Sequence, residues 1–117
     1  MLSNTGKERQ AEFRKLLKEY YSQLPLVSSR DDICERRLTA FFHMTIIAQH
    51  EGQMPWALSF YELIFDSFLY DEGSKSAKND YLFHLIDISQ RLERYIPNEL
   101  ETFYLKGIEV LRQLLQG

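Results

Sequence analysis

The sequence predicts an all-α protein of about five antiparallel helices, arranged as stacked helical hairpins or as a compact bundle. Almost no stretch alternates apolar and polar residues with the period of two that strands show, whereas apolar residues recur every three or four positions. Only three prolines and five glycines occur, and they fall between the periodic segments. The 117 residues suit a single helical domain, 1–117.

The composition is that of a folded globular protein and disfavours several classes of function. Apolar residues make up 44% of the chain and charged residues 26%, and the net charge is −3, without the basic face that nucleic-acid binding needs. No apolar run approaches the roughly 20 residues that span a bilayer, and the first residues lack the apolar segment of a secretory signal. The single cysteine, Cys34, fits a reducing compartment. We therefore expect a cytoplasmic protein with neither a nucleic-acid nor a membrane partner.

The first helix is expected over residues 6–23. Thr5 can serve as its N-cap, and Glu8 three residues later completes a capping box. The apolar residues of this segment lie on one side, which predicts a helix on the outside of the core. They are Phe13, Leu16, Leu17, Tyr20, Tyr21 and Leu24.

The second helix is expected from an N-cap at Ser29 to about Glu51, after Pro25 and two serines break the chain. At 100° per residue its apolar side chains nearly encircle the axis, which predicts a central position for this helix and the next, with Phe41 in the core. These side chains are Leu38, Ala40, Phe41, Phe42, Met44, Ile46, Ile47 and Ala48. The remaining polar strip is narrow and consists of Arg36, Thr39, His43 and His50.

The third helix is expected from Pro55 to about Tyr70. Gly52 ends the preceding helix, and a proline fits the first helical turn because its missing N–H would be unpaired there anyway. A broad apolar stripe is assigned to the core: Ala57, Leu58, Phe60, Tyr61, Ile64, Phe65, Phe68 and Leu69. A narrower stripe, Trp56, Leu63 and Tyr70, is spaced by seven and is separated from the first by Ser59, Glu62, Asp66 and Ser67.

Two further helices complete the predicted fold. Residues 71–76 form a polar loop, the fourth helix is expected over residues 77–95, and the fifth runs from the turn at 96–98 to about residue 115. The fourth helix buries Leu82, Leu85, Ile86, Ile88 and Leu92. The fifth has a one-sided pattern, which predicts a peripheral helix; its apolar side consists of Leu100, Phe103, Tyr104, Ile108, Leu111, Leu114 and Leu115. The short connections predict that most successive helices are antiparallel neighbours.

The second and third helices resemble one hairpin of a tetratricopeptide repeat. The pattern runs from Gly52 through Ala57 and Leu58 to Tyr61 and Glu62, and the resemblance covers residues 44–65. In that family a glycine closes the first helix and a small residue lets the second approach closely. A weak internal repeat with an offset of 42 residues relates Pro55, Leu58 and Tyr61 to Pro97, Leu100 and Phe103, although hairpins that start at proline also look alike without repetition. The resemblance implies that the chain binds a protein or peptide.

One set of residues raises an enzymatic alternative. An arginine followed by a histidine after four to six residues resembles the pair in HEPN ribonucleases, and Arg36 or Arg37 with His43 has this spacing. The resemblance implies a histidine that moves protons and an arginine that stabilises phosphate charge. A solvated strip on a buried helix explains the same residues, and we favour that reading. Cys34 and the histidines lack metal-ligand spacing, and no glycine-rich phosphate loop occurs, so no metal or cofactor is expected.

The narrow stripe of Trp56, Leu63 and Tyr70 is the candidate partner-binding surface. If the first or fourth helix covers it, the stripe belongs to the core. If it is open, it suits a partner, because Trp and Tyr are favoured interface anchors and a seven-residue spacing fits a facing helix. We expect a non-enzymatic module that binds another protein or peptide as an adaptor, chaperone or inhibitor. A homodimer joined through the third helix is the alternative.

Overall fold

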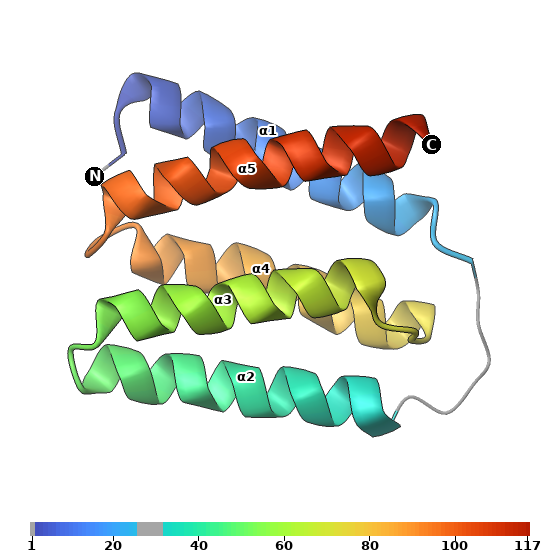
Figure 1. The fold of residues 1–117 in the computed structure, drawn as a ribbon, viewed down its shortest axis with the longest axis horizontal. Helices are drawn as coiled ribbons and strands as arrows, with labels where there is room; N and C mark the ends of the chain where they lie inside the picture. Colours follow the sequence, from blue (N-terminus) through green and yellow to red (C-terminus); the bar gives the residue numbers. More distant parts are fainter. Residues whose placement is uncertain (1, 26–31) are drawn as a thin grey trace.

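The computed structural model describes residues 2–25 and 32–117, without the side chains of Asp32 and Ile33. This part of the chain forms five helices and no strand. The helices are α1 (Asn4–Ser22), α2 (Asp32–His50), α3 (Met54–Tyr70), α4 (Lys75–Leu92) and α5 (Pro97–Gln116). Successive helices run in opposite directions, so the predicted all-α fold is confirmed (Figure 1). The predicted N-cap Ser29 lies outside the described residues.

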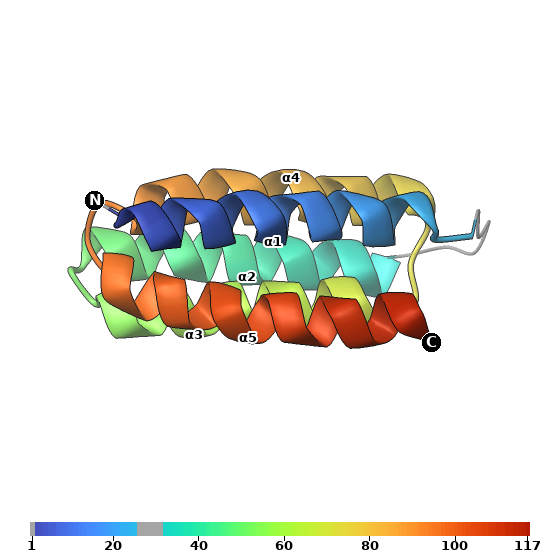
Figure 2. The ribbon, with the colours of Figure 1, turned by 90° about the horizontal axis from the view of Figure 1, so that it is seen from above.

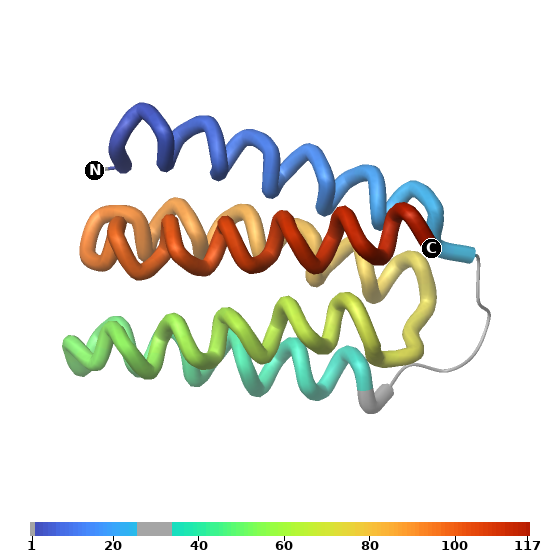
Figure 3. Tube along the Cα trace, turned by 45° about the horizontal axis from the view of Figure 1, so that its top comes forward, coloured from blue at the N-terminus to red at the C-terminus, as the bar shows by residue number. Residues whose placement is uncertain are grey.

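The helices form a flat molecule of 40 × 33 × 16 Å. Seen from above, α1 and α4 lie in one layer, and α3 and α5 lie in the other (Figure 2). The hairpin of α2 and α3 occupies one edge, and α1 lies at the opposite edge beside α5 (Figures 1 and 3). α1 and α5 run in the same direction, as do α2 and α4, so these two pairs are parallel, whereas successive helices are antiparallel (Figure 1).

The predicted central position of the second helix is wrong. α2 packs closely on α3 and only slightly on α4, so one side of it is open. Phe41, assigned to the core, is half-buried, and Met44 and Ile47 are exposed. An apolar pattern on all sides predicts burial only if neighbours cover all sides, and α2 at the edge of the molecule has too few.

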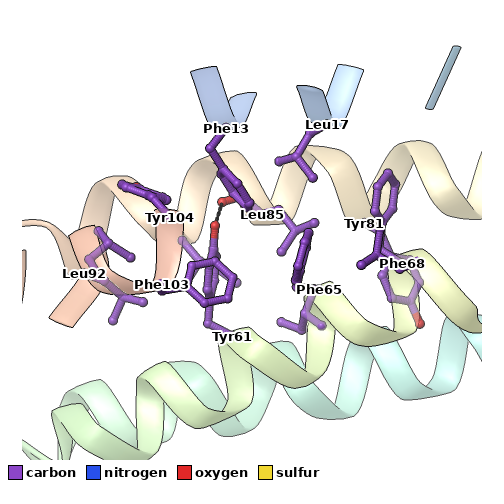
Figure 4. Close-up of a cluster of buried hydrophobic side chains, with 14 of the residues drawn as sticks. Phe13, Leu17, Tyr61, Phe65, Phe68, Tyr81, Leu85, Leu92, Phe103 and Tyr104 are labelled. Atoms are coloured by element: carbon purple, nitrogen blue, oxygen red, sulfur yellow. Dashed lines mark hydrogen bonds between the residues drawn. The ribbon is translucent and has the colours of Figure 1, made fainter. Parts of the chain in front are cut away.

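The predicted central position of the third helix is confirmed by the aromatic core. Phe65 on α3 meets Phe13 of α1 and Phe103 of α5, each with ring centroids 5.4 Å apart (Figure 4). Tyr61 contacts Phe103 at 5.0 Å and donates its hydroxyl to the carbonyl of Leu85 on α4 at 2.8 Å. Such ring pairs contribute roughly 0.5–1.5 kcal/mol each beyond the burial of their area. Through Tyr61 and Phe65, α3 thus contacts α1, α4 and α5.

A glycine allows α1 and α5 to approach closely. Gly107 is buried in the middle of α5, and a Cβ placed there would lie 2.5 Å from Cε1 of Phe13. The ring of Phe13 therefore lies where any larger residue would project. Arg112 and Glu12 form an ion pair across the same two helices.

The helix caps differ in detail from those expected. Ser3, rather than Thr5, caps α1, and its Oγ accepts a hydrogen bond from the Gly6 amide at 3.0 Å. Ser74 caps α4 in the same way, so this helix begins at Lys75 and not at residue 77. Gly52, with φ of 71°, ends α2 as predicted, and the Gln53 amide donates to the carbonyl of Ala48 at 2.8 Å. That bond turns the chain directly into α3.

Candidate protein-binding face

The stripe of Trp56, Leu63 and Tyr70 is open to solvent. These side chains are 63%, 42% and 64% exposed, so neither α1 nor α4 covers them, and the core interpretation of the stripe is wrong. On α2, Met44 and Ile47 are 44% and 54% exposed. We call these five residues the apolar face.

Two contacts fix the alignment of α2 and α3 and bring the two exposed rows together. At one end, the Gln53 amide bonds the Ala48 carbonyl, and at the other Arg37 forms a 2.7 Å ion pair with Asp71, directly after Tyr70. In an antiparallel hairpin, counting from the Arg37–Asp71 pair places Met44 level with Ile64, and counting from the Ala48–Gln53 bond places it level with Ala57, so Met44 lies beside residues 57–64 of α3. Met44 also follows Arg37 by seven residues and so lies on the side of α2 that faces Asp71. The row on α2 therefore runs beside the row on α3.

Acidic residues border the apolar face. Glu62 and Asp66 are exposed on α3 beside Leu63 and Tyr70, and Glu51 lies at the end near Trp56. Residues 51–72 contain five acidic residues and no Lys or Arg. Partial burial raises the pKa of Asp66 above its usual range. An apolar centre with a charged rim is the usual arrangement of a protein interface.

The end of the face near Tyr70 is held by a hydrogen-bonded cluster. Asp71 accepts hydrogen bonds from Arg37 and from Ser67. Burial alone would raise the pKa of Asp71, but these two hydrogen bonds and the nearby cations outweigh it and lower the pKa. The hydroxyls of Ser67 and Tyr81 lie 2.8 Å apart, and Tyr81 donates to the carbonyl of Cys34 at 2.7 Å. The cluster thus ties α2, α3 and α4 together beneath the apolar face.

Lys78 belongs to the same cluster and was not identified from the sequence. Its side chain is buried, and Nζ donates to the carbonyls of Ser67 at 2.9 Å and Phe68 at 2.6 Å. These carbonyls lie in the last turn of α3, and that of Ser67 also accepts the Asp71 amide at 3.0 Å. A lysine in the first turn of a helix gives no sequence signal for burial, because lysines are normally exposed.

The residues of the enzymatic alternative are not gathered into one site. Arg37 is paired with Asp71, whereas Arg36 lines a shallow hollow with Glu35 and Thr39. His43 lines a different hollow of about 410 Å³ between α2 and α4, together with Asp80 and His84. The ring of His84 lies 4.4 Å from that of Phe42, and burial lowers the pKa of His84. The two hollows share Glu35 and Thr39, but neither is lined by both His43 and one of the two arginines.

A larger hollow of about 850 Å³ lies between the ends of α2 and α4. Arg91, Arg94, His50 and Tyr95 contribute to its wall, and Arg91 is already paired with Asp87 on its own helix at 3.3 Å. Both helices end here, so their carbonyl ends give the hollow a negative potential that the arginines offset. The basic residues of this hollow are thus explained by the Arg91–Asp87 ion pair and by the negative potential of the two helix ends.

No group of three or more His, Cys, Asp or Glu side chains in residues 2–25 and 32–117 could hold a metal ion. None of the described helices is both long and apolar enough to cross a membrane. Models of protein families, curated proteins and solved structures gave no match to this chain.

Proposed function

We propose that this chain is a non-enzymatic module that binds another protein through the apolar face. The observation that carries this proposal is the exposure of Trp56, Leu63 and Tyr70 in one row, next to Met44 and Ile47. Single exposed apolar residues are common on folded proteins, but a contiguous row of large ones marks an interaction surface.

The residue types support an interface with a well-packed centre. Trp and Tyr contribute large areas and few rotatable bonds, and they are enriched among the residues that dominate binding energy. Here they stand at the two ends of the row, with Leu63 midway. The resemblance of residues 44–65 to a tetratricopeptide hairpin points to the same function, since that family binds proteins and peptides.

A different protein suits this face better than a second copy of the same chain. If two copies met through α3, Glu62 and Asp66 of one copy would lie near the same acids of the other. The segment 51–72 has no Lys or Arg to pair with them. Like charges opposite each other disfavour an interface, so we propose a heterologous partner.

The proposal is tested by comparing what wild-type and variant proteins capture from the native cell. Trp56→Ser/Leu63→Ser removes one end and the middle of the row on α3, and Phe83→Ser removes an equally exposed aromatic residue, 64% exposed on α4. Changes at exposed positions usually alter stability by about 0.5 kcal/mol or less, so all three proteins are expected to fold. Melting followed by circular dichroism checks this.

We expect wild type and Phe83→Ser to retain the same partner and the double variant to lose it. Retention by the double variant would contradict the proposed function, and so would equal loss by both variants. If the double variant unfolds, Trp56→Ser alone provides the comparison, because Trp56 is 63% exposed.

A further inference from the structure

We propose that the partner presents an amphipathic helix of about four turns, with apolar residues along one side and Lys or Arg on its flanks. This inference rests on the proposed function and identifies the chemistry of the partner. It follows from the spacing of the apolar face and from the charges at its border.

The spacing fits a helix. Trp56, Leu63 and Tyr70 are each seven residues apart, so the row extends about 21 Å along α3. Two helices packed at a shallow angle meet every seven residues, and a facing helix of about 14 residues would contact the whole row. Met44 and Ile47 on α2 form a second row, so the facing helix would contact both α2 and α3.

The acidic residues at the border of the apolar face favour basic residues on the flanks of the facing helix. Glu51 lies near the Trp56 end of the face, and Glu62 and Asp66 follow its outer side. The nearest cation of α2 in the alignment, Arg37, already pairs with Asp71. The acidic border therefore remains to be neutralised, and a Lys or Arg on the facing helix would do so.

The most basic helix of a second copy, α1, does not offer the same combination. α1 has exposed lysines, among them Lys7, Lys15 and Lys18. Its apolar side, with Phe13 and Leu17, is already buried against the rest of the molecule. A second copy could thus supply the positive charge of α1 but not its apolar residues.

The raised pKa of Asp66 makes the affinity for the facing helix depend on pH. Partial burial raises the pKa of Asp66 in the free protein, and a cation brought beside it would lower this pKa. Binding then releases a proton whenever Asp66 is protonated in the free protein. The affinity for a basic helix should accordingly increase as the pH rises through the pKa of Asp66.

The chain contains its own reporter for this binding, since Trp56 is its only tryptophan. The probes are synthetic peptides of about 20 residues without Trp or Tyr, with leucines along one helical face. One peptide carries lysines on both flanks, and the other carries glutamates at the same positions. Titration with the lysine peptide should shift the Trp56 emission to shorter wavelength, and the glutamate peptide should bind at least about tenfold more weakly.

Matched variants distinguish an effect of the acids at the border of the face from an effect of the overall negative charge. Glu62→Gln/Asp66→Asn removes two acids from the border, whereas Glu8→Gln/Glu109→Gln removes two exposed acids elsewhere. The first variant should bind the lysine peptide roughly three- to tenfold more weakly than wild type. The second should bind it like wild type. Equal binding of both peptides, or equal weakening by both variants, would overturn the inference.

Neutral phosphatidylcholine vesicles test whether the apolar face meets a lipid surface instead. An emission shift with vesicles and none with the lysine peptide would overturn the inference. If the lysine peptide fails to bind but cellular capture still depends on Trp56 and Leu63, only the basic helix is wrong. If capture also proves independent of these residues, the proposed function falls with it.

Discussion

At the scale of single residues, Lys78 shows how a polar side chain can hold a core together. Its ammonium group donates to two carbonyls at the end of α3 and lies within 5.8 Å of the Phe68 ring centre. Without this donor the Phe68 carbonyl loses its charged partner in a buried environment, whereas the Ser67 carbonyl keeps the bond from the Asp71 amide. We predict that Lys78→Met lowers the free energy of unfolding by about 2 kcal/mol.

Urea unfolding of wild type, Lys78→Met and Lys75→Met measures this effect. Lys75 is half-buried, makes a long 3.4 Å hydrogen bond to the Ser22 carbonyl and lies 5.2 Å from the Tyr21 ring centre, so its variant should stay closer to wild type. A Lys78→Met protein as stable as wild type would show that the cost of burying the ammonium group cancels its hydrogen bonds.

A second prediction at this scale concerns His84 and pH. Burial lowers the pKa of His84, and Nδ1 is buried without a hydrogen-bond partner among the described residues. The carboxylates of Asp80 and Asp87 oppose this shift, and Arg91 adds to it; Glu35 and His43 line the same hollow from α2. The unfolded chain therefore binds a proton more readily than the folded protein.

The stabilising contribution of neutral His84 is fully present above about pH 6.5, the unfolded value, and is lost as the pH falls through the folded pKa. Melting temperatures of wild type and His84→Gln across pH 5–8 test this. We expect wild type to lose stability relative to the variant as the pH decreases. A difference that stays constant with pH would show that His84 makes no such contribution.

At the scale of helices, the contact between α1 and α5 depends on Gly107. Alanine would normally favour a helix interior by about 1 kcal/mol over glycine. Here its Cβ would lie 2.5 Å from the Phe13 ring, which also contacts Phe65 and Phe103 and cannot move freely. We predict that Gly107→Ala lowers the free energy of unfolding by about 1–3 kcal/mol.

Combining Gly107→Ala with Phe13→Leu tests whether the contact with the Phe13 ring causes this loss of stability. The smaller leucine makes room for the new methyl group, so the double variant should be less destabilised than the sum of the two single variants. Additive effects, or a stabilised Gly107→Ala protein, would contradict a close packing of α1 on α5.

At the scale of the whole molecule, the sequence predicted the number and direction of the helices, because each has a periodic apolar side and clear breaks. It also predicted the core side of α5, where Leu100, Phe103 and Leu111 are buried. The predicted position of α2 was wrong, since periodicity identifies apolar sides but not the neighbours that cover them. For the same reason Met44 and Ile47 were assigned to the core, although they lie on the surface.

The candidate site could be predicted only in part for the same reason. Trp56, Leu63 and Tyr70 were recognised as a separate row by their spacing, but whether another helix covered them depends on how distant segments pack. Lys78 could not be identified, because its burial results from the meeting of α3 and α4. The tertiary arrangement was therefore needed to turn an apolar row into a candidate binding face.

The most direct test of the central claim is photo-crosslinking at Leu63 in the native cell. A benzoylphenylalanine at position 63 should form one discrete adduct with another protein, which Trp56→Ser reduces, whereas the same probe at Phe83 should not form it. Both positions are exposed, so the comparison controls for chance collisions. An adduct pattern at position 63 no different from that at position 83, or an adduct of two copies of this chain alone, would contradict a heterologous protein partner at the apolar face.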